Sequence, residues 1–284
     1  LVARLRIPRE TTPPESKLKS LAHIPRLVTG KLRQLPDFII IGAQRAGTSS
    51  LFAYLEQHPQ ITGSSKKEVH YFDTHFHKGE TWYRSFFPLS QANGGDHIVG
   101  EASPYYIVHP HCPARIHQLL PEVKLIALLR NPSERAISHY FHELSRGCED
   151  LDLQAALDAE EDRIRDEWKR LQSDGAYRSR AHQSFSYKQR GLYLEQLKRY
   201  HQFFSRERLL VLDSGELFRN PEATFTRILE FLGVDSPCDQ ISFSPKNAGK
   251  YSAEVSASLV EDLDAYFAPH NQALFTYLGQ SFDW

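Results

Sequence analysis

The 284-residue sequence contains no methionine and only three cysteines. Cys112, Cys148 and Cys238 are too far apart along the chain to form a metal-type pair, and their small, odd number favours a reducing, cytoplasmic location. No apolar run reaches the ~20 residues that span a bilayer, and residues 1–20 lack the apolar core of a signal peptide. The sequence therefore indicates no transmembrane segment, although the missing initial methionine leaves an upstream targeting segment open.

Net charge is also nearly absent, at -1 for the whole chain, which gives no reason to expect nucleic-acid binding. Any anion-binding site must therefore be local. Positive charge is concentrated in residues 1–36, an arm that several prolines interrupt. We expect this arm to be solvated and loosely packed. The sharper alternative is contact with an acidic substrate or an acidic surface, such as peripheral contact with a membrane. The remaining residues, 37–284, are enough for a single α/β domain.

The stretch that organises the chain is 37–51, which reads D-F-I-I-I-G-A-Q-R-A-G-T-S-S-L. Residues 38–41 are apolar and rich in β-branched side chains, which predicts a buried strand. A loop with two glycines follows at 42–47, and a helical pattern then begins and runs to Gln57. Such an arrangement binds anions, because the unpaired N–H groups of a first helical turn and the helix dipole both favour negative charge. The residues predicted to contact the anion are Gly42, Gln44, Arg45, Ala46, Gly47, Thr48 and Ser49.

The spacing of this loop is nearly that of the nucleotide P-loop, G-x-x-x-x-G-K-[ST]. Gly42 and Gly47 match, but Thr48 stands where the lysine that reaches the β- and γ-phosphates should be. This substitution argues against a kinase or ATPase, and Arg45 supplies the cation from inside the loop. The alternative interpretation is an ordinary strand-to-helix turn with incidental glycines.

A second anion site is predicted where another apolar run, 123–129, ends at Arg130. Asn131 and Pro132 are a suitable N-cap and first residue for the next helix, which would carry Ser138 two turns in. Ligands in open α/β sheets collect at the carboxyl ends of the strands, so we expect Arg130 to bind a ligand. A surface ion pair is the alternative.

Further strands are predicted at 97–102 and 209–212, and further helices at 222–232 and about 253–267. Strands that alternate with helices predict a mostly parallel sheet with helices on both faces, of the P-loop-NTPase-like α/β class. The charged segment 149–188 is predicted to be a helical insertion that could form a lid over an acceptor substrate.

Residues 66–73, K-K-E-V-H-Y-F-D, contain the candidates for acid–base chemistry. Alternation puts Glu68 and His70 on one side of an extended segment. Glu68 is the predicted general base, kept ionised by its lysine neighbours, and His70 is expected to keep a pKa near ~6.5 and to contact the group being transferred or the acceptor. Asp73 is expected to be a turn or cap residue. A solvated turn of mixed charge is the alternative.

The acceptor is expected to contact basic groups from two segments. A basic run at 177–190 includes Tyr177, Phe185 and Tyr187, whose rings could face those of a sugar chain, while cations contact acidic groups. The same run could accept a lipid, a carrier-bound acyl chain or a small metabolite. The candidate acceptor residues are Lys66, Lys67, Arg178, Arg180 and His182.

Four stretches together resemble one family: I-I-G-A-Q-R-A-G-T-S-S-L, K-K-E-V-H-Y-F-D, L-L-R-N-P-S-E-R-A-I-S-H-Y and L-G-Q-S-F-D-W. Residues 36–284 are similar to the sulfotransferases that use 3′-phosphoadenosine 5′-phosphosulfate, in the carbohydrate branch of the heparan sulfate N- and 3-O-sulfotransferases and their bacterial relatives. The resemblance implies that the 42–49 loop holds the 5′-phosphosulfate, that Arg130 and Ser138 hold the 3′-phosphate, and that Glu68 is the base. It completes the donor-binding set with Tyr193, Lys246, Gly249 and Lys250.

Three departures from the family pattern qualify the resemblance. Arg45 stands in place of the loop lysine, Ala102 in place of a second lysine, and the cysteine pair of the animal enzymes is absent near Lys250. The last departure favours a bacterial or cytoplasmic enzyme. We expect sulfuryl transfer to a hydroxyl or amine of a carbohydrate without a metal, and the sequence does not indicate the oligomeric state. The alternatives are a P-loop kinase and a non-catalytic module that binds a nucleotide or glycan.

Overall fold

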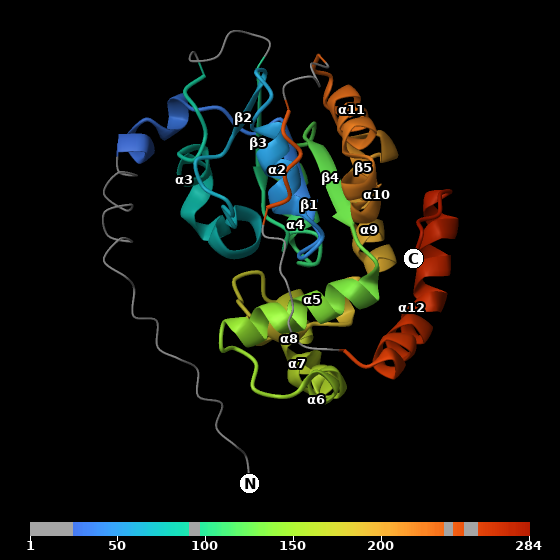
Figure 1. The fold of residues 1–284 in the computed structure, drawn as a ribbon. Coiled ribbons are helices and arrows are strands. Elements are labelled where there is room, and N and C mark those ends of the chain that lie inside the picture. The colour runs from blue at the N-terminus through green and yellow to red at the C-terminus, as the bar shows by residue number, and fades with distance from the viewer. Residues whose placement is uncertain (1–24, 91–96, 236–240, 247–254) are drawn as a thin grey trace.

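The computed structural model describes residues 25–90, 97–235, 241–246 and 255–284. Their five strands form one parallel sheet in the order β2-β3-β1-β4-β5 (Figure 1). The strands are β1 (Phe38–Gly42), β2 (Ile61–Gly63), β3 (Ile98–Ala102), β4 (Lys124–Leu129) and β5 (Leu209–Asp213). The predicted parallel α/β architecture is therefore confirmed.

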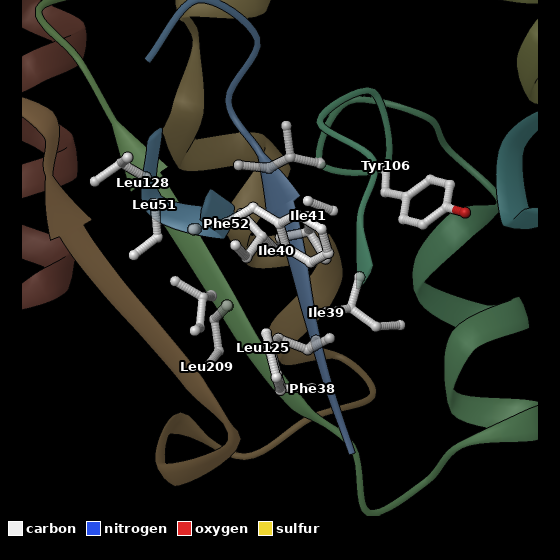
Figure 2. Packing of buried hydrophobic residues seen from close by; sticks show 14 of the residues in the cluster. Phe38, Ile39, Ile40, Ile41, Leu51, Phe52, Tyr106, Leu125, Leu128 and Leu209 are labelled. Atoms are coloured by element: carbon white, nitrogen blue, oxygen red, sulfur yellow. The ribbon is translucent and has the colours of Figure 1, made fainter. Parts of the chain in front are cut away.

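The central strand β1 is buried at every position, as a strand covered on both faces must be. Figure 2 shows Ile39, Ile40 and Ile41 packed among side chains of the neighbouring strands and of α2 (Thr48–Leu55). Full burial stabilises each such aliphatic side chain by about 1.5–3 kcal/mol. This packing fixes the end of β1, and with it the start of the glycine loop.

Helices surround the sheet, and a second group of helices lies beyond the carboxyl ends of its strands (Figure 1). The surrounding helices are α3 (Gly79–Arg84), α4 (Cys112–Leu119), α9 (Tyr193–His201), α10 (Ser214–Arg219), α11 (Pro221–Leu232) and α12 (Ala257–Leu278). Beyond the strand ends lie α5 (Pro132–Ser145), α6 (Leu153–Asp158), α7 (Glu160–Ser173) and α8 (Arg180–Phe185). The predicted insertion is thus helical.

The insertion packs with α5 and α12 around a second, smaller hydrophobic core. Phe185 and Tyr187 belong to this core and are 9% and 0% exposed. The expectation that these two rings face an acceptor is therefore wrong, because both are used in packing. Tyr177 is half-buried and donates a hydrogen bond to Glu167.

Residues 25–36 are tied to the domain more firmly than expected. Arg26 donates hydrogen bonds to the carbonyls of Ser85 and Phe87, and Arg33 donates a second one to Phe87. Arg33 is consequently buried despite its charge. Residues 1–24, the rest of the predicted arm, lie outside the described residues.

Candidate active site

The glycine loop after β1 leads directly into α2, as predicted. Gly47, which precedes the helix, has φ of 92°, a left-handed conformation that favours glycine. A side chain there would also meet the ring of Phe218, whose nearest carbon lies 2.8 Å from the position of a Cβ. Among the described residues no side chain caps the N-terminus of α2, so its first N–H groups remain available to an anion.

The two predicted anion sites are neighbours. Nε of Arg45 donates to Oγ of Ser138 at 3.0 Å, which joins the loop to α5. Arg130 donates to the carbonyl oxygen of Arg45 at 3.2 Å, and its guanidinium also pairs with Glu134 at 2.8 Å. Asn131 caps α5 by accepting from the N–H groups of Ser133 and Glu134, as expected. Arg130 thus makes the surface ion pair of the alternative interpretation and still lies at the strand end.

These groups line a cleft of about 640 Å³ at the carboxyl edge of the sheet. Its lining includes loop residues 44–49 and also Glu68, Arg130, Glu134, Ser138, His142, Phe218, Lys246 and Trp284. The predicted base therefore shares one cleft with both predicted anion sites. Ser50 of α2 holds the backbone of Lys246, whose N–H donates to its Oγ at 2.8 Å. Gly249 and Lys250 lie outside the described residues.

Glu68, His70 and Asp73 form a chain of contacting side chains. Nε2 of His70 lies 2.9 Å from a carboxylate oxygen of Glu68, and its Nδ1 lies 2.7 Å from Oδ2 of Asp73. The Asp73 side chain is fully buried, whereas those of His70 and Glu68 are 30% and 35% exposed. The expectation that Asp73 is a turn or cap residue is wrong, because its carboxylate orients the imidazole.

The two carboxylates determine the charge of the histidine. Burial alone would lower the pKa of His70, but the hydrogen bonds and charges of Asp73 and Glu68 outweigh it and raise that pKa to about 10. His70 is therefore an imidazolium at neutral pH, which corrects the expectation of a pKa near ~6.5. Burial raises the pKa of Glu68, but His70 and then Lys67, 3.8 Å away, bring it below the ordinary value. Glu68 is thus ionised and able to accept a proton.

We expect Asp73→Asn to lower the pKa of His70 from about 10 toward ~6.5, because it removes the first of the contributions that raise it. In the unchanged protein the ring should stay protonated from pH 6 to pH 8, and in the variant it should lose its proton at lower pH. NMR titration of the imidazole nitrogens measures this, with the resonance assigned by its loss in His70→Gln. A wild-type His70 that titrates near pH 6.5 would contradict the assignment.

Several predicted site residues support the structure around the cleft through packing or hydrogen bonds to other residues of the protein. A side chain at Gly42 would come within 2.4 Å of Ile107, so this glycine serves close packing at the end of β1. Tyr193 is 1% exposed, and its hydroxyl donates to the carbonyl oxygen of Arg130 at 2.8 Å. Gln44 lines the cleft, where its Oε1 accepts from the buried Arg190.

His182 lies in the interior of the protein. The prediction that it contacts the acceptor is therefore wrong. Its ring is fully buried and stacks on Trp168. Its Nδ1 lies 2.7 Å from the hydroxyl of Tyr105, and its Nε2 lies 2.7 Å from Oε1 of Gln189. Burial lowers its pKa to about 3, so the ring is neutral and occupied on both nitrogens.

Exposed cations gather beside the segment 66–73, which carries Glu68 and His70. A nitrogen of Arg178 lies 3.4 Å from Nδ1 of His77, and Nζ of Lys78 lies 4.5 Å from the centre of the Trp82 ring. Burial, followed by the positive charges of Lys78, Arg178 and Lys66, lowers the pKa of His75 to about 4. We name Lys66, Lys78 and Arg178 the basic cluster. In the described part of the chain none of the three has a carboxylate partner at ion-pair distance.

Sequence reasoning missed Asp73 and the aromatic side of the cleft. Phe218 follows β5 on α10, and Trp284 is fixed by a hydrogen bond from its Nε1 to Asp213 at 2.9 Å. An aromatic residue in the short helix that follows the last strand, and a tryptophan at the end of a motif already singled out, are the signals that could have identified Phe218 and Trp284.

Comparison with known proteins adds an independent line of evidence. The sulfotransferase domain family matches residues 35–284. The membrane-associated sulfotransferase kil1 of Dictyostelium discoideum is 27% identical, over 90% of this chain and 68% of its own. The heparan sulfate glucosamine 3-O-sulfotransferase 6 of Mus musculus is also 27% identical, over 98% of this chain and 82% of its own. A crystal structure of a sulfotransferase from Alicyclobacillus acidocaldarius matches with a TM-score of 0.71 and 30% identity, covering 88% of this chain and 98% of that one.

Proposed function

Because the chain belongs to the sulfotransferase family, and is therefore an enzyme that uses 3′-phosphoadenosine 5′-phosphosulfate, we propose that it sulfates a hydroxyl (or amine) of a carbohydrate. One observation carries the mechanism: Glu68 lies in the same cleft as the anion-binding loop, Arg130 and Ser138. A base and a donor site in one cleft are what an in-line transfer requires.

The positive charges and N–H groups that line the cleft support the phosphosulfate donor. The N-terminus of α2, with Arg45 in the loop before it, would hold the 5′-phosphosulfate. Arg130 and Ser138 would hold the 3′-phosphate, with Lys246 across the cleft. To do so, Arg130 would exchange its ion pair with Glu134, 59% exposed, for the phosphate, a cheap exchange because exposed pairs contribute little.

The proposed chemistry parallels phosphoryl transfer, in which positioning and charge stabilisation supply most of the catalysis. Glu68 would accept the proton from the attacking hydroxyl as the new S–O bond forms, while the bond to the phosphate of the donor breaks. Arg45 and the loop N–H groups would stabilise the negative charge that the leaving phosphate takes up. The His70 imidazolium would hold the Glu68 carboxylate in place and stabilise charge on the transferred group.

The basic cluster and the names of relatives support a carbohydrate acceptor with an acidic group. Lys66, Lys78 and Arg178 lie close to the segment that carries Glu68 and have no carboxylate partner in the described ranges. A carboxylate or sulfate on the acceptor would supply one. Arg180 is exposed on α8, where an acceptor could reach it. Lys67 lies 3.8 Å from the proposed base Glu68. Both residues therefore stay in the proposed acceptor set.

Location is a separate matter. Within the described ranges, no helix combines the length and apolar character needed to cross a bilayer. The relative kil1 is membrane-associated by name. A cytoplasmic location for this chain, with peripheral membrane contact through the basic arm at residues 1–36, stays a prediction from the sequence.

Donor competition tests the proposed reaction against the kinase alternative. The enzyme is incubated with a mixed acceptor panel and either sulfur-labelled 3′-phosphoadenosine 5′-phosphosulfate or ATP labelled in its γ-phosphate with Mg²⁺. We expect label in product only from the phosphosulfate. Label transferred from ATP, with none from the phosphosulfate, would establish a phosphotransferase, and donor binding without turnover on every acceptor would indicate a binding module.

We expect Arg130→Ala and Ser138→Ala to weaken binding of 3′-phosphoadenosine 5′-phosphate far more than binding of AMP, which lacks the 3′-phosphate. A charge-assisted contact is worth about 1.5–3 kcal/mol, roughly ten- to a hundredfold in affinity. Titration calorimetry measures both ligands. Arg208→Ala is the matched control. This arginine directly precedes β5 and so lies at the amino ends of the strands, whereas the cleft lies at their carboxyl ends. Equal losses for the two nucleotides would remove both residues from the 3′-phosphate.

A further inference from the structure

A fully buried carboxylate, Glu101, lies at the carboxyl end of β3. Three hydroxyls donate to it: Tyr83 at 2.6 Å, Ser103 at 2.8 Å and Tyr106 at 3.2 Å. A buried carboxylate needs such partners, because an unpaired charge in the interior is strongly unfavourable. Burial raises the pKa of Glu101 to about 7, although the three hydrogen bonds act to lower it.

Two of these hydroxyls also accept hydrogen bonds from the backbone of residues 68–73, the catalytic segment, which carries the proposed base Glu68 together with His70 and Asp73. Oγ of Ser103 accepts from the N–H groups of Val69 at 3.1 Å and His70 at 3.2 Å. The hydroxyl of Tyr106 accepts from the N–H group of Tyr71 at 2.7 Å and, at 3.4 Å, from the next one along the chain. Consecutive N–H groups at 69–72 are therefore held by two side chains.

The direction of these hydrogen bonds depends on Glu101. A hydroxyl has one proton to donate, so an oxygen that accepts from the backbone must direct its own proton elsewhere. For Ser103 and Tyr106, Glu101 is the acceptor of that proton. The carboxylate thus orients both hydroxyls as acceptors toward 69–72, although within the described ranges it makes no direct hydrogen bond to this segment.

The segment that these hydroxyls hold contains an unfavourable backbone conformation. His70 has φ of 57°, a left-handed conformation that non-glycine residues seldom adopt, and a short π-helix, Tyr71–His75, begins directly after it. Contact of His70 with both Glu68 and Asp73 depends on this local conformation. Loss of the backbone hydrogen bonds would therefore displace the side chains that carry the chemistry.

We propose that Glu101, acting through the hydroxyls of Ser103 and Tyr106, is a positioning residue that sets the placement of Glu68 and His70. The inference rests on the proposed function, since it assigns a role to what positions the proposed base. None of the three residues needs to contact substrate. Their effect is on the orientation of the catalytic segment, where a displacement of about 1 Å can cost on the order of 10²-fold in rate.

The test compares variants that remove single hydroxyls. We expect Ser103→Ala and Tyr106→Phe each to lower kcat at least roughly tenfold with the affinity for 3′-phosphoadenosine 5′-phosphate unchanged, and Ser103→Thr, which keeps the hydroxyl, to restore most of kcat. The matched control is Tyr83→Phe. It also removes a hydroxyl that donates to Glu101, but one that, in the described part of the chain, makes no hydrogen bond to 69–72. It keeps the ring that stacks on Tyr71 at 4.4 Å. Its kcat should stay within about threefold of wild type.

The outcomes separate this inference from the proposed function. Ser103→Ala and Tyr106→Phe variants that lower kcat no more than Tyr83→Phe would overturn the positioning role, and so would an inactive Ser103→Thr variant. Glu68→Gln is measured alongside. If Glu68→Gln lowers kcat and the hydroxyl variants do not, the positioning inference fails while the proposed base stands. If Glu68→Gln retains normal kcat, the proposed base itself is wrong, and the positioning inference falls with it.

Discussion

Glu68→Gln is expected to lower kcat at least ~10²-fold while the affinity for the donor stays unchanged. Glutamine keeps the shape of glutamate and removes its basicity, and a positioned base typically contributes ~10²–10⁴-fold. The Glu68 carboxylate lies in the cleft and is held ionised, since His70 at 2.9 Å and Lys67 at 3.8 Å both stabilise its charge. Steady-state kinetics with saturating donor, together with calorimetry of 3′-phosphoadenosine 5′-phosphate, measures both quantities.

His70→Ala is the informative comparison for this variant. Because His70 is protonated at neutral pH, it has no free nitrogen with which to accept a proton, and its removal should cost less than removal of the base. The opposite order, with near-normal kcat for Glu68→Gln and an inactive His70→Ala, would assign the base to the histidine. The pKa of about 10 would then also be wrong.

The second large effect is expected at Arg45. Arg45→Ala should reduce kcat at least ~10²-fold, because it removes the cation that we propose stabilises the leaving phosphate, and Arg45→Lys should keep a substantial part of the activity. The leaving group is a phosphate of low pKa, so it needs charge stabilisation more than it needs a proton. Single-turnover rates with each variant measure the effect.

The hydrogen bond from Arg45 to Ser138 provides the control for this prediction. Ser138→Ala removes one hydrogen-bond partner of the guanidinium but leaves the charge of Arg45, so kcat should fall less than in Arg45→Ala. An inactive Arg45→Lys variant with unchanged folding would mean that the planar guanidinium makes a bidentate contact that lysine cannot replace.

The strands could be predicted from the sequence because strands covered on both faces are apolar along their whole length. The runs at 38–41, 123–129 and 209–212 gave β1, β4 and β5 to within a residue at each end. β2 could not be predicted, since three residues are too few to show a pattern. The last helix continues through Pro269 to Leu278, past its predicted end, because packing of residues such as Leu274 into the core stabilises the final turns.

The site was predictable where it depends on local geometry. Glu68 and His70 were expected on one side of the chain, and they are in contact. Asp73 was missed because its contact depends on the left-handed conformation of His70 and the π-helix that follows. Glu101 could not be assigned a role either, although a lone carboxylate in an apolar strand is a signal that it must have buried partners.

The most direct test of the account is an acceptor screen with sulfur-labelled 3′-phosphoadenosine 5′-phosphosulfate. The panel contains glycans with and without carboxylate or sulfate groups, lipids, carrier-bound acyl chains and small hydroxylated metabolites, and Glu68→Gln is assayed beside the wild-type enzyme. The account predicts label in glycans, most of all in acidic ones, and little or none with Glu68→Gln. Label that enters only non-sugar acceptors would contradict it.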